Sequence, residues 1–391
     1  MLMSGWASAG WAQPSAGQDE LLRVGPIGVT PRVTLSGGYD SNVLNRADDE
    51  REDVVMDLRP TVDVVVGHNR VRLATATTGV LAYFRDYPGQ GGMGVNHSAE
   101  LAWLGNRVRP FMAGTYMNSN DRFSLEIDER ARRTEYAGRA GFSARVASKG
   151  ELSTVVERSV FRFASITDAQ GRPLNQNLNR TTDRAAASVG YSYSPFTTVG
   201  VTAEARRDQF EAVTRPAARS FRVVPTLDLR AGLITGRAEL GLLRFAPQVA
   251  GVAAFTGPVA AVGLTYVLRD RTRFAVRVGR DLSYSADAPL AYFLQSGISA
   301  SIGRAFGERW ELSGSWDRQE LDYRNRFPVE SPAADAGLGG FRVTSSRGQL
   351  EFRIRRDLRC SVVAELSSRT AGASLRGFEK LRVFTAIAYG L

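Results

Sequence analysis

Side chains that commonly perform catalysis or bind transition metals are scarce in this chain of 391 residues. Its only histidines are His68 and His97, and Cys360 is its only cysteine. One cysteine cannot form a disulfide within the chain, and two histidines fall short of a zinc ligand set. His97 precedes Ser98, but adjacent residues of a strand point to opposite faces and cannot act together as base and nucleophile. We therefore expect no enzyme, no metal site and no cofactor.

Arginine is the abundant functional side chain. Only Lys149 and Lys380 are lysines among 50 basic residues, so 48 are arginines, and with 40 acidic residues the formal charge is +10. A guanidinium stays charged at physiological pH and binds carboxylate or phosphate groups. A nucleic-acid-binding protein gathers basic residues on one face or along one helix, whereas these are spread through the chain. Their distribution argues against nucleic acid as a partner.

The elements expected to position these arginines are strands, because apolar and polar residues alternate from Val29 onward. In 347–355, for example, Leu350, Phe352 and Ile354 share one face, and three arginines share the other. These runs last about 10 to 14 residues, whereas soluble strands average five or six and membrane-crossing strands need about 9 to 11. No apolar run approaches the ~20 residues of a transmembrane helix. The pattern therefore favours strands that cross a membrane.

Eighteen segments of this kind follow one another, and short connections alternate strictly with longer loops. The short connections include 67–69, 106–107 and 194–196, and the longer ones include 41–52 and 119–133. The predicted strands are residues 28–40, 53–66, 70–84, 94–105, 108–118, 134–147, 151–163, 183–194, 197–208, 219–230, 234–246, 257–268, 271–285, 289–304, 309–324, 341–356, 359–369 and 378–391.

This rhythm is typical of a bacterial outer-membrane barrel. A soluble sandwich would show the same alternation, but the strand length, the strand count and the connection rhythm favour the barrel. We predict an all-β fold, a single closed antiparallel transmembrane β-barrel of about 18 strands over residues 28–391, in the outer membrane of a Gram-negative bacterium. Its last strand would run to Leu391 and pair with the first, which leaves no edge in lipid.

The chain ends and the aromatic residues fit this layout. Residues 1–12 are small and apolar, which we interpret as a remnant signal peptide, with a flexible tail as the alternative, and residues 13–27 would form a periplasmic N-terminal segment. Aromatic residues near strand ends are expected to form two interfacial girdles. They are Tyr39, Tyr83, Tyr284 and Tyr292 at the loop side and Phe111, Phe196, Tyr266, Trp310 and Tyr389 at the turn side.

The opening of the predicted barrel resembles a known family. The stretch Gly37-Gly38-Tyr39-Asp40-Ser41-Asn42-Val43, an acidic loop and then Leu58-Arg59-Pro60-Thr61-Val62 are similar to the first two strands of the putative β-barrel porin 2 family. The motif also has a local interpretation, because Asp and Asn favour turns at a strand exit. The resemblance implies an 18-stranded barrel and a role in exporting exopolysaccharide across the outer membrane.

The charged face is the candidate functional surface, because a wide barrel turns its apolar face to lipid and its charged face to a wet lumen. Many of these charges would pair across strands with carboxylates such as Asp63, Glu204 and Asp281, and the unpaired excess would favour anions. The predicted pore-lining arginines are Arg32, Arg59, Arg139, Arg145, Arg184, Arg206, Arg222, Arg230, Arg237, Arg273, Arg277, Arg347, Arg353 and Arg355.

Three functions remain open at this stage. The first is a pore for exopolysaccharide export, which would dock periplasmic export components, and the second is an uptake porin for small anionic or sugar solutes. A third is a structural or adhesive surface barrel. Uptake porins usually fold a long loop into the lumen, and the longest candidates are 164–182, with Asn175, Gln176, Asn177 and Asn179 that suit sugar hydroxyls, and 325–340.

The predicted partners outside the pore are outer-membrane lipid and lipopolysaccharide. The acidic segment 48–53 could bind divalent cations and through them bridge to lipopolysaccharide, since carboxylates suit such cations. We favour the simpler interpretation of this segment as a solvated loop.

Overall fold

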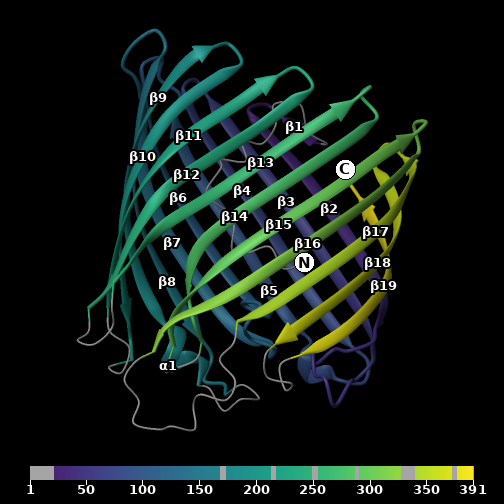
Figure 1. Ribbon diagram of the computed structural model, residues 1–391. Coiled ribbons are helices and arrows are strands. Elements are labelled where there is room, and N and C mark those ends of the chain that lie inside the picture. The colour runs from purple at the N-terminus through teal and green to yellow at the C-terminus, as the bar shows by residue number, and fades with distance from the viewer. Residues whose placement is uncertain are drawn as a thin grey trace.

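The computed structural model describes residues 22–390, apart from 168–172, 213–216, 249–253, 287–289, 327–339 and 372–376. In this part of the chain nearly every residue of regular structure is in one antiparallel sheet (Figure 1). The strands are β1 Leu22–Val24, β2 Ile27–Asp40, β3 Asp53–His68, β4 Val71–Phe84, β5 Gly92–Trp103, β6 Val108–Asp121, β7 Ala131–Arg145, β8 Gly150–Phe163, β9 Arg180–Ser194, β10 Thr197–Phe210, β11 Ala218–Ala231, β12 Ile234–Pro247, β13 Phe255–Leu268, β14 Thr272–Tyr284, β15 Leu290–Phe306, β16 Trp310–Arg326, β17 Phe341–Arg355, β18 Leu358–Ala371 and β19 Phe378–Tyr389.

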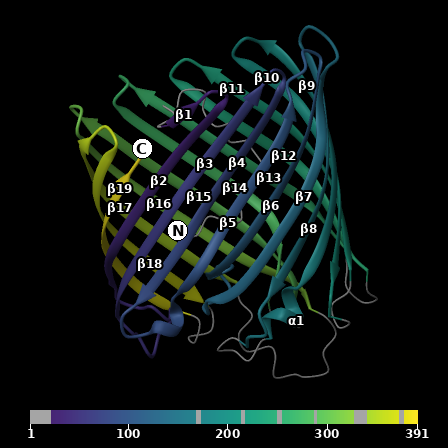
Figure 2. The same ribbon diagram turned by 180° about the vertical axis from the view of Figure 1, so that it is seen from behind.

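The strands β2 to β19 close into a barrel of 18 strands, because each pairs with its neighbours in sequence and β19 pairs with β2. Figures 1 and 2 show the tilted strands arranged as a barrel. Short turns join the strands at one end, here called the turn end. Longer connections at the other end, the loop end, include the 3₁₀ helix η1 Pro88–Gln90 and the helix α1 Leu174–Leu178.

The predicted fold class is confirmed, and all 18 predicted strands lie within three residues of the observed ends among the described residues. The short strand β1, which forms a small hairpin with β2, was not predicted. The predicted leader 1–12, residues 13–21 of the N-terminal segment and Leu391 lie outside the described residues. None of the described helices is long and apolar enough to span a membrane.

The motif that carries the family resemblance joins the first strand to the last. The Asp40 carboxylate forms an ion pair with Lys380 Nζ at 2.8 Å, and the Asn42 side-chain amide donates a hydrogen bond to the Glu379 carbonyl at 3.2 Å. Ser41 and Leu381 exchange hydrogen bonds, since the Leu381 N–H donates to Ser41 Oγ at 2.9 Å and the Ser41 N–H donates to the Leu381 carbonyl. These contacts close the seam of the barrel, in addition to the local turn that the motif predicts.

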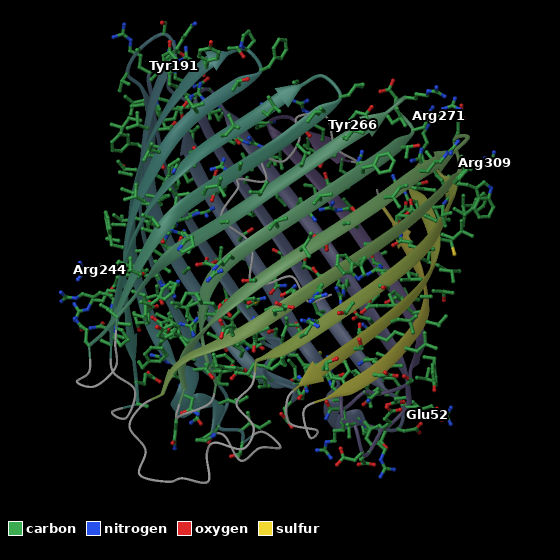
Figure 3. All side chains as sticks on the ribbon, viewed as in Figure 1. Glu52, Tyr191, Arg244, Tyr266, Arg271 and Arg309 are labelled. Atoms are coloured by element: carbon green, nitrogen blue, oxygen red, sulfur yellow. The ribbon has the colours of Figure 1, made fainter. Side chains whose placement is uncertain are left out.

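The two faces of the wall differ as the alternation predicts. Leu58, Met112 and Leu242 belong to a set of large apolar side chains exposed on the outside, and the intervening residues of the same strands face inward. Tyr191 and Tyr266 lie at the turn end in Figure 3. Of the predicted girdle, Tyr39, Tyr83, Trp310 and Tyr389 are exposed on the outward register, and Phe196 is exposed in the turn between β9 and β10.

Three girdle assignments were wrong. Phe111 stands on the inward register, beside the backbone of Gly141. Tyr284 and Tyr292 are at the loop ends of β14 and β15, but these ends curl into the lumen and carry both side chains away from lipid. Tyr292 is only 1% exposed and packs against inward-facing Phe245 of β12. Tyr284 and Tyr292 do lie on the outward register that the alternation predicts, but the ends of β14 and β15 leave the wall and carry them inward.

The curl begins where β14 separates from β13. Strand β13 pairs with β12 as far as Phe255, but with β14 only as far as Ala260, which lies opposite Arg280. Beyond that point β14 and β15 continue to pair with each other, up to Tyr284 opposite Tyr292. Side chains that continue the outward register of β14 and β15 therefore pack on the inner face of β11, β12 and β13 near the loop end.

Candidate pore constriction and charged lumen

The connection between β6 and β7, residues 122–130, folds across the lumen at the loop end. Arg369 of β18 donates to both carboxylate oxygens of Asp128, at 2.9 and 2.6 Å, and to the Leu125 carbonyl at 3.1 Å. Arg122 donates to the Val43 carbonyl of the β2–β3 loop at 2.6 Å and to the Asp128 carbonyl. A loop of nine residues is thus tied to β18 and to the β2–β3 loop.

The same loop contacts the curled hairpin. Glu126 accepts hydrogen bonds from Ser285 Oγ at 2.6 Å and from the Ala286 N–H at 2.7 Å. Asn177 of α1 donates to the Ala286 carbonyl at 2.8 Å. Leu174 of α1, together with Ile127, belongs to a buried apolar cluster that also includes Ala286. Loop 122–130, helix α1 and the curled ends of β14 and β15 are called the constriction from here on.

Charges within the constriction are buried and paired. The Arg369 and Asp128 side chains are only 2% and 10% exposed, so their two-fold hydrogen-bonded pair is shielded from water. Burial lowers the pKa of Arg122 to about 10, which still leaves this guanidinium charged at neutral pH. Removal of any one partner would leave an uncompensated buried charge. The constriction is therefore held in one arrangement by directional contacts.

A small polar cavity of about 310 Å³ lies between the curled β14 and the wall formed by β8 to β13. Glu204 accepts hydrogen bonds from Arg184 Nε at 2.6 Å and from Arg222 at 2.9 Å, and Arg222 also reaches Asp281 at 3.7 Å. The volume is within the range of small-molecule sites. The arginines here alternate with carboxylates, so the cavity offers both donors and acceptors.

Asp208 fixes the curled strand to this wall. It accepts hydrogen bonds from Thr182 Oγ1 at 2.6 Å, from Arg206 at 2.8 Å and from the Tyr284 hydroxyl at 2.8 Å. Arg180 stacks its guanidinium over the Tyr284 ring at 5.6 Å. The tyrosine thus bridges β14 to β10 across the inner surface of three intervening strands.

The fourteen predicted arginines stand on the register opposite the exposed apolar side chains. Seven form ion pairs with carboxylates on the same face: Arg32 with Asp63, Arg59 with Asp57, Arg139 with Glu100, Arg184 with Glu204 and Glu157, Arg206 with Asp208, Arg222 with Glu204 and Asp281, and Arg237 with Asp228 and Glu239.

The other seven lie mostly toward the turn end. Arg355 pairs with Asp357 at 3.7 Å, and Arg347 contacts Gln349. Among the described residues, no carboxylate lies within ion-pair distance of the remaining five, and all five are exposed. These five are Arg145, Arg230, Arg273, Arg277 and Arg353. The excess positive charge of the inner face is therefore concentrated toward the turn end.

The sequence did not single out the residues that build the constriction. Arg122, Glu126 and Asp128 lie in a loop with ordinary surface composition, and Arg369 was not assigned to the pore. The longer segment 164–182 contributes α1, in which Asn177 does bind the hairpin, whereas most of 325–340 lies outside the described residues. Only the bulk of Phe123 and Ile127 within this polar loop hints at burial.

The remaining candidates have local partners. His97 shares a hydrogen bond of 2.8 Å with Thr77 on the outward register. In the acidic segment, Asp49 pairs with Arg51 at 2.6 Å, and Asp53 accepts hydrogen bonds from the Asp86 and Tyr87 backbone. These contacts give both features ordinary structural roles.

Membrane-length strands, an apolar outer surface and a charged lumen narrowed by an inward loop define an integral porin of the bacterial outer membrane. The chain belongs to the putative β-barrel porin 2 family, whose model matches residues 21–376. A comparison with curated protein sequences gives no match.

Three solved porins are similar in fold. OccK2 (OpdF) of Pseudomonas aeruginosa, in complex with glucuronate, has a TM-score of 0.51 and 10% identity, over 93% of this chain and 98% of that one. OpdK of the same organism has a TM-score of 0.51 and 12% identity, over 92% and 98%. A BenF-like porin from Pseudomonas fluorescens Pf-5 has a TM-score of 0.50 and 10% identity, over 93% and 99%. At these identities the likeness establishes the fold alone.

Proposed function

We propose that this protein is a passive uptake channel for small anionic solutes such as carboxylated sugars. The observation that carries the proposal is the division of the lumen into a packed constriction at the loop end and exposed, unpaired arginines toward the turn end. A constriction limits solute size, and arginines that line a pore favour anions. Because short turns of such barrels face the periplasm, an entering solute would meet the constriction first and the free arginines next.

The fourteen predicted arginines line the pore in this proposal, with two roles. The paired ones, such as Arg184 and Arg222, hold the wall and alternate donors with acceptors around the small cavity. The unpaired ones, such as Arg273 and Arg277, attract the carboxylate of the solute. A sugar acid carries hydroxyls, which suit the mixed donors and acceptors of the paired arginines, and one carboxylate, which suits the unpaired arginines.

Export of exopolysaccharide, the function implied by the family resemblance, has less support. A continuous polymer needs an unobstructed lumen, whereas loop 122–130, α1 and the hairpin are joined across it by buried hydrogen bonds. The same contacts argue against a purely adhesive barrel, because loop 122–130 and α1 pack inward and are not displayed at the cell surface. Uptake of single small solutes is the function that this arrangement supports best.

The proposal is tested with the purified protein in planar bilayers and liposomes. We expect a reversal potential that shows preference for chloride over potassium, and faster entry of glucuronate than of uncharged glucose. Glucuronate is a suitable probe because OccK2, which shares the fold, was solved with it. High salt should reduce the difference, since exposed charges are screened. Cation preference, or passage of a long acidic polysaccharide, would overturn the proposal.

A further inference from the structure

A second site lies on the outside of the barrel, where the wall from β4 to β12 has a hollow of about 1250 Å³. Its floor consists of small outward-facing residues at paired positions, with Gly114 opposite Gly138 and Ala185 opposite Ala205. Met112 stands on the same register and is 58% exposed, which places the hollow on the lipid side of the wall.

Because the strands are tilted (Figure 1), a row of paired residues that lines the hollow leads from the middle of the apolar band to the loop end. Gly138 lies at the middle of β7, and the residues paired with it in turn along the sheet are Arg158 on β8 and Asp183 on β9. The same row continues to Arg207 on β10 and Arg219 on β11, where it reaches the loop end. An elongated apolar molecule would fit along this path.

Arginines gather at the loop end of the hollow. Arg158, Arg207, Arg219 and Arg244 all line it, and Figure 3 shows Arg244 projecting outward near the loop end. The only carboxylate in this row is Asp183, which lies 3.6 Å from Arg158. Arg207 and Arg219 are direct cross-strand partners, an arrangement that is unfavourable for like charges unless an anion lies between them.

The opposite wall shows how outward arginines are otherwise accommodated. Arg318 and Arg342 also face outward near the loop end, and both pair with Glu320, at 2.8 and 2.7 Å. In the part of the chain that the structure describes, no carboxylate pairs with Arg207, Arg219 or Arg244. Among the described residues, the hollow therefore gathers three outward arginines that have no carboxylate partner.

We propose that the hollow binds one phosphorylated lipid of the outer leaflet. Its phosphate would lie on Arg207, Arg219 and Arg244, and one acyl chain would extend toward the middle of the wall over Gly138 and Ala205. Basic side chains at a membrane surface attract anionic headgroups, and arginine suits phosphate through its two parallel donors. The position of the arginines, at the loop-side edge of the apolar band, matches the depth of a headgroup.

The experiment measures lipid retained by the full-length protein in detergent, by native mass spectrometry, after incubation with lipid A that carries both phosphates. Dephosphorylated lipid A tests the need for phosphate, and inorganic phosphate alone tests whether the acyl chain is needed. The Arg207→Gln/Arg219→Gln variant removes the headgroup contacts. Gly138→Phe fills the floor, where an added Cβ has no atom within 4 Å and so should not disturb the wall. Arg342→Gln is the matched control on the opposite wall.

We expect the double variant to bind phosphorylated lipid A about thirtyfold more weakly, from two lost surface charges. Gly138→Phe should weaken binding as well, whereas Arg342→Gln should bind normally. Each variant must keep the heat-dependent gel shift of a closed barrel. Equal retention of the dephosphorylated lipid, unchanged retention by both variants, or a homo-oligomer that dissociates when Gly138 is replaced would each refute the lipid site. The last result would identify the hollow as an interface between copies.

Discussion

At the scale of single residues, the inner arginines differ in what lies beside them. Arg277 has Gly263 and Ser299 as its cross-strand neighbours, and Arg273 has Val267 and Gly303. Small neighbours without charge leave these two guanidinium groups open to the lumen. Arg184, by contrast, lies between Glu157 and Glu204 and is neutralised by them. The same residue type on the same face can therefore attract solute or hold the wall.

The Arg273→Gln/Arg277→Gln variant tests this distinction. A charge about 8 Å from an anion in water contributes about 0.5 kcal/mol, so the loss of two should lower the chloride-to-potassium permeability ratio about fivefold. Reversal potentials in planar bilayers measure the ratio. Arg304→Gln is the matched control, because Arg304 lies on β15 opposite Thr272 but on the outward register. An equal effect of the control would show that the inner position does not matter.

At the scale of elements, the constriction depends on short segments that meet only in the folded barrel. Loop 122–130 reaches β18 through Arg369, the β2–β3 loop through Arg122 and the curled hairpin through Glu126. Each of these contacts joins residues far apart in sequence. The constriction is therefore a property of the closed barrel and not of any one loop.

Arg369→Gln should release loop 122–130 from β18. It leaves Asp128 as a buried charge without its partner, which costs about 3–5 kcal/mol, so the loop should leave the lumen and single-channel conductance should rise. Adding Asp128→Asn should restore part of the original conductance, because an amide pair can be hydrogen-bonded without charge. Arg359→Gln is the control, because Arg359 lies on β18 like Arg369 but pairs with Glu351 of β17. Unchanged conductance in Arg369→Gln would show that the pair does not hold the constriction.

At the scale of the whole molecule, closure depends on the seam between β2 and β19. Gly38 lies so close to β19 that a Cβ there would come within 2.2 Å of the Val383 carbonyl oxygen, whereas a Cβ on Gly37 would have no neighbour closer than 3.8 Å. The family motif thus places glycine where the two strands meet. Its Asp40, Ser41 and Asn42 then join the same strands through polar contacts.

Gly38→Ala should therefore impair folding far more than Gly37→Ala. The added methyl group must displace backbone of β19, and overpacking of this kind costs about 3 kcal/mol at a site that cannot relax. The yield of refolded barrel, measured by the heat-dependent gel shift, should fall for Gly38→Ala and stay near normal for Gly37→Ala. Similar yields for the two variants would contradict the role assigned to the seam.

Much of the barrel could be predicted from the sequence, because alternation is a local property. Side chains of a strand point to opposite faces in turn, so the register of Arg347, Leu350 and Phe352 follows from their spacing. Strand ends also followed from turn residues such as Asn69 and Arg269–Asp270, which adopt positive φ at tight turns. The candidate site was predicted less completely, since pairing between arginines and carboxylates depends on cross-strand register.

The sequence by itself determined the strands, their two faces, the number of membrane crossings and the arginine-rich composition of the inner face. Only the tertiary structure decided that β14 leaves the wall beyond Arg280, that Arg369 binds Asp128, and that Arg207 and Arg219 lie side by side on the outside. The physical reason is the distance along the sequence over which each feature is determined. Alternation acts between adjacent residues, whereas the constriction and the outer hollow need residues that approach one another only after the barrel has closed.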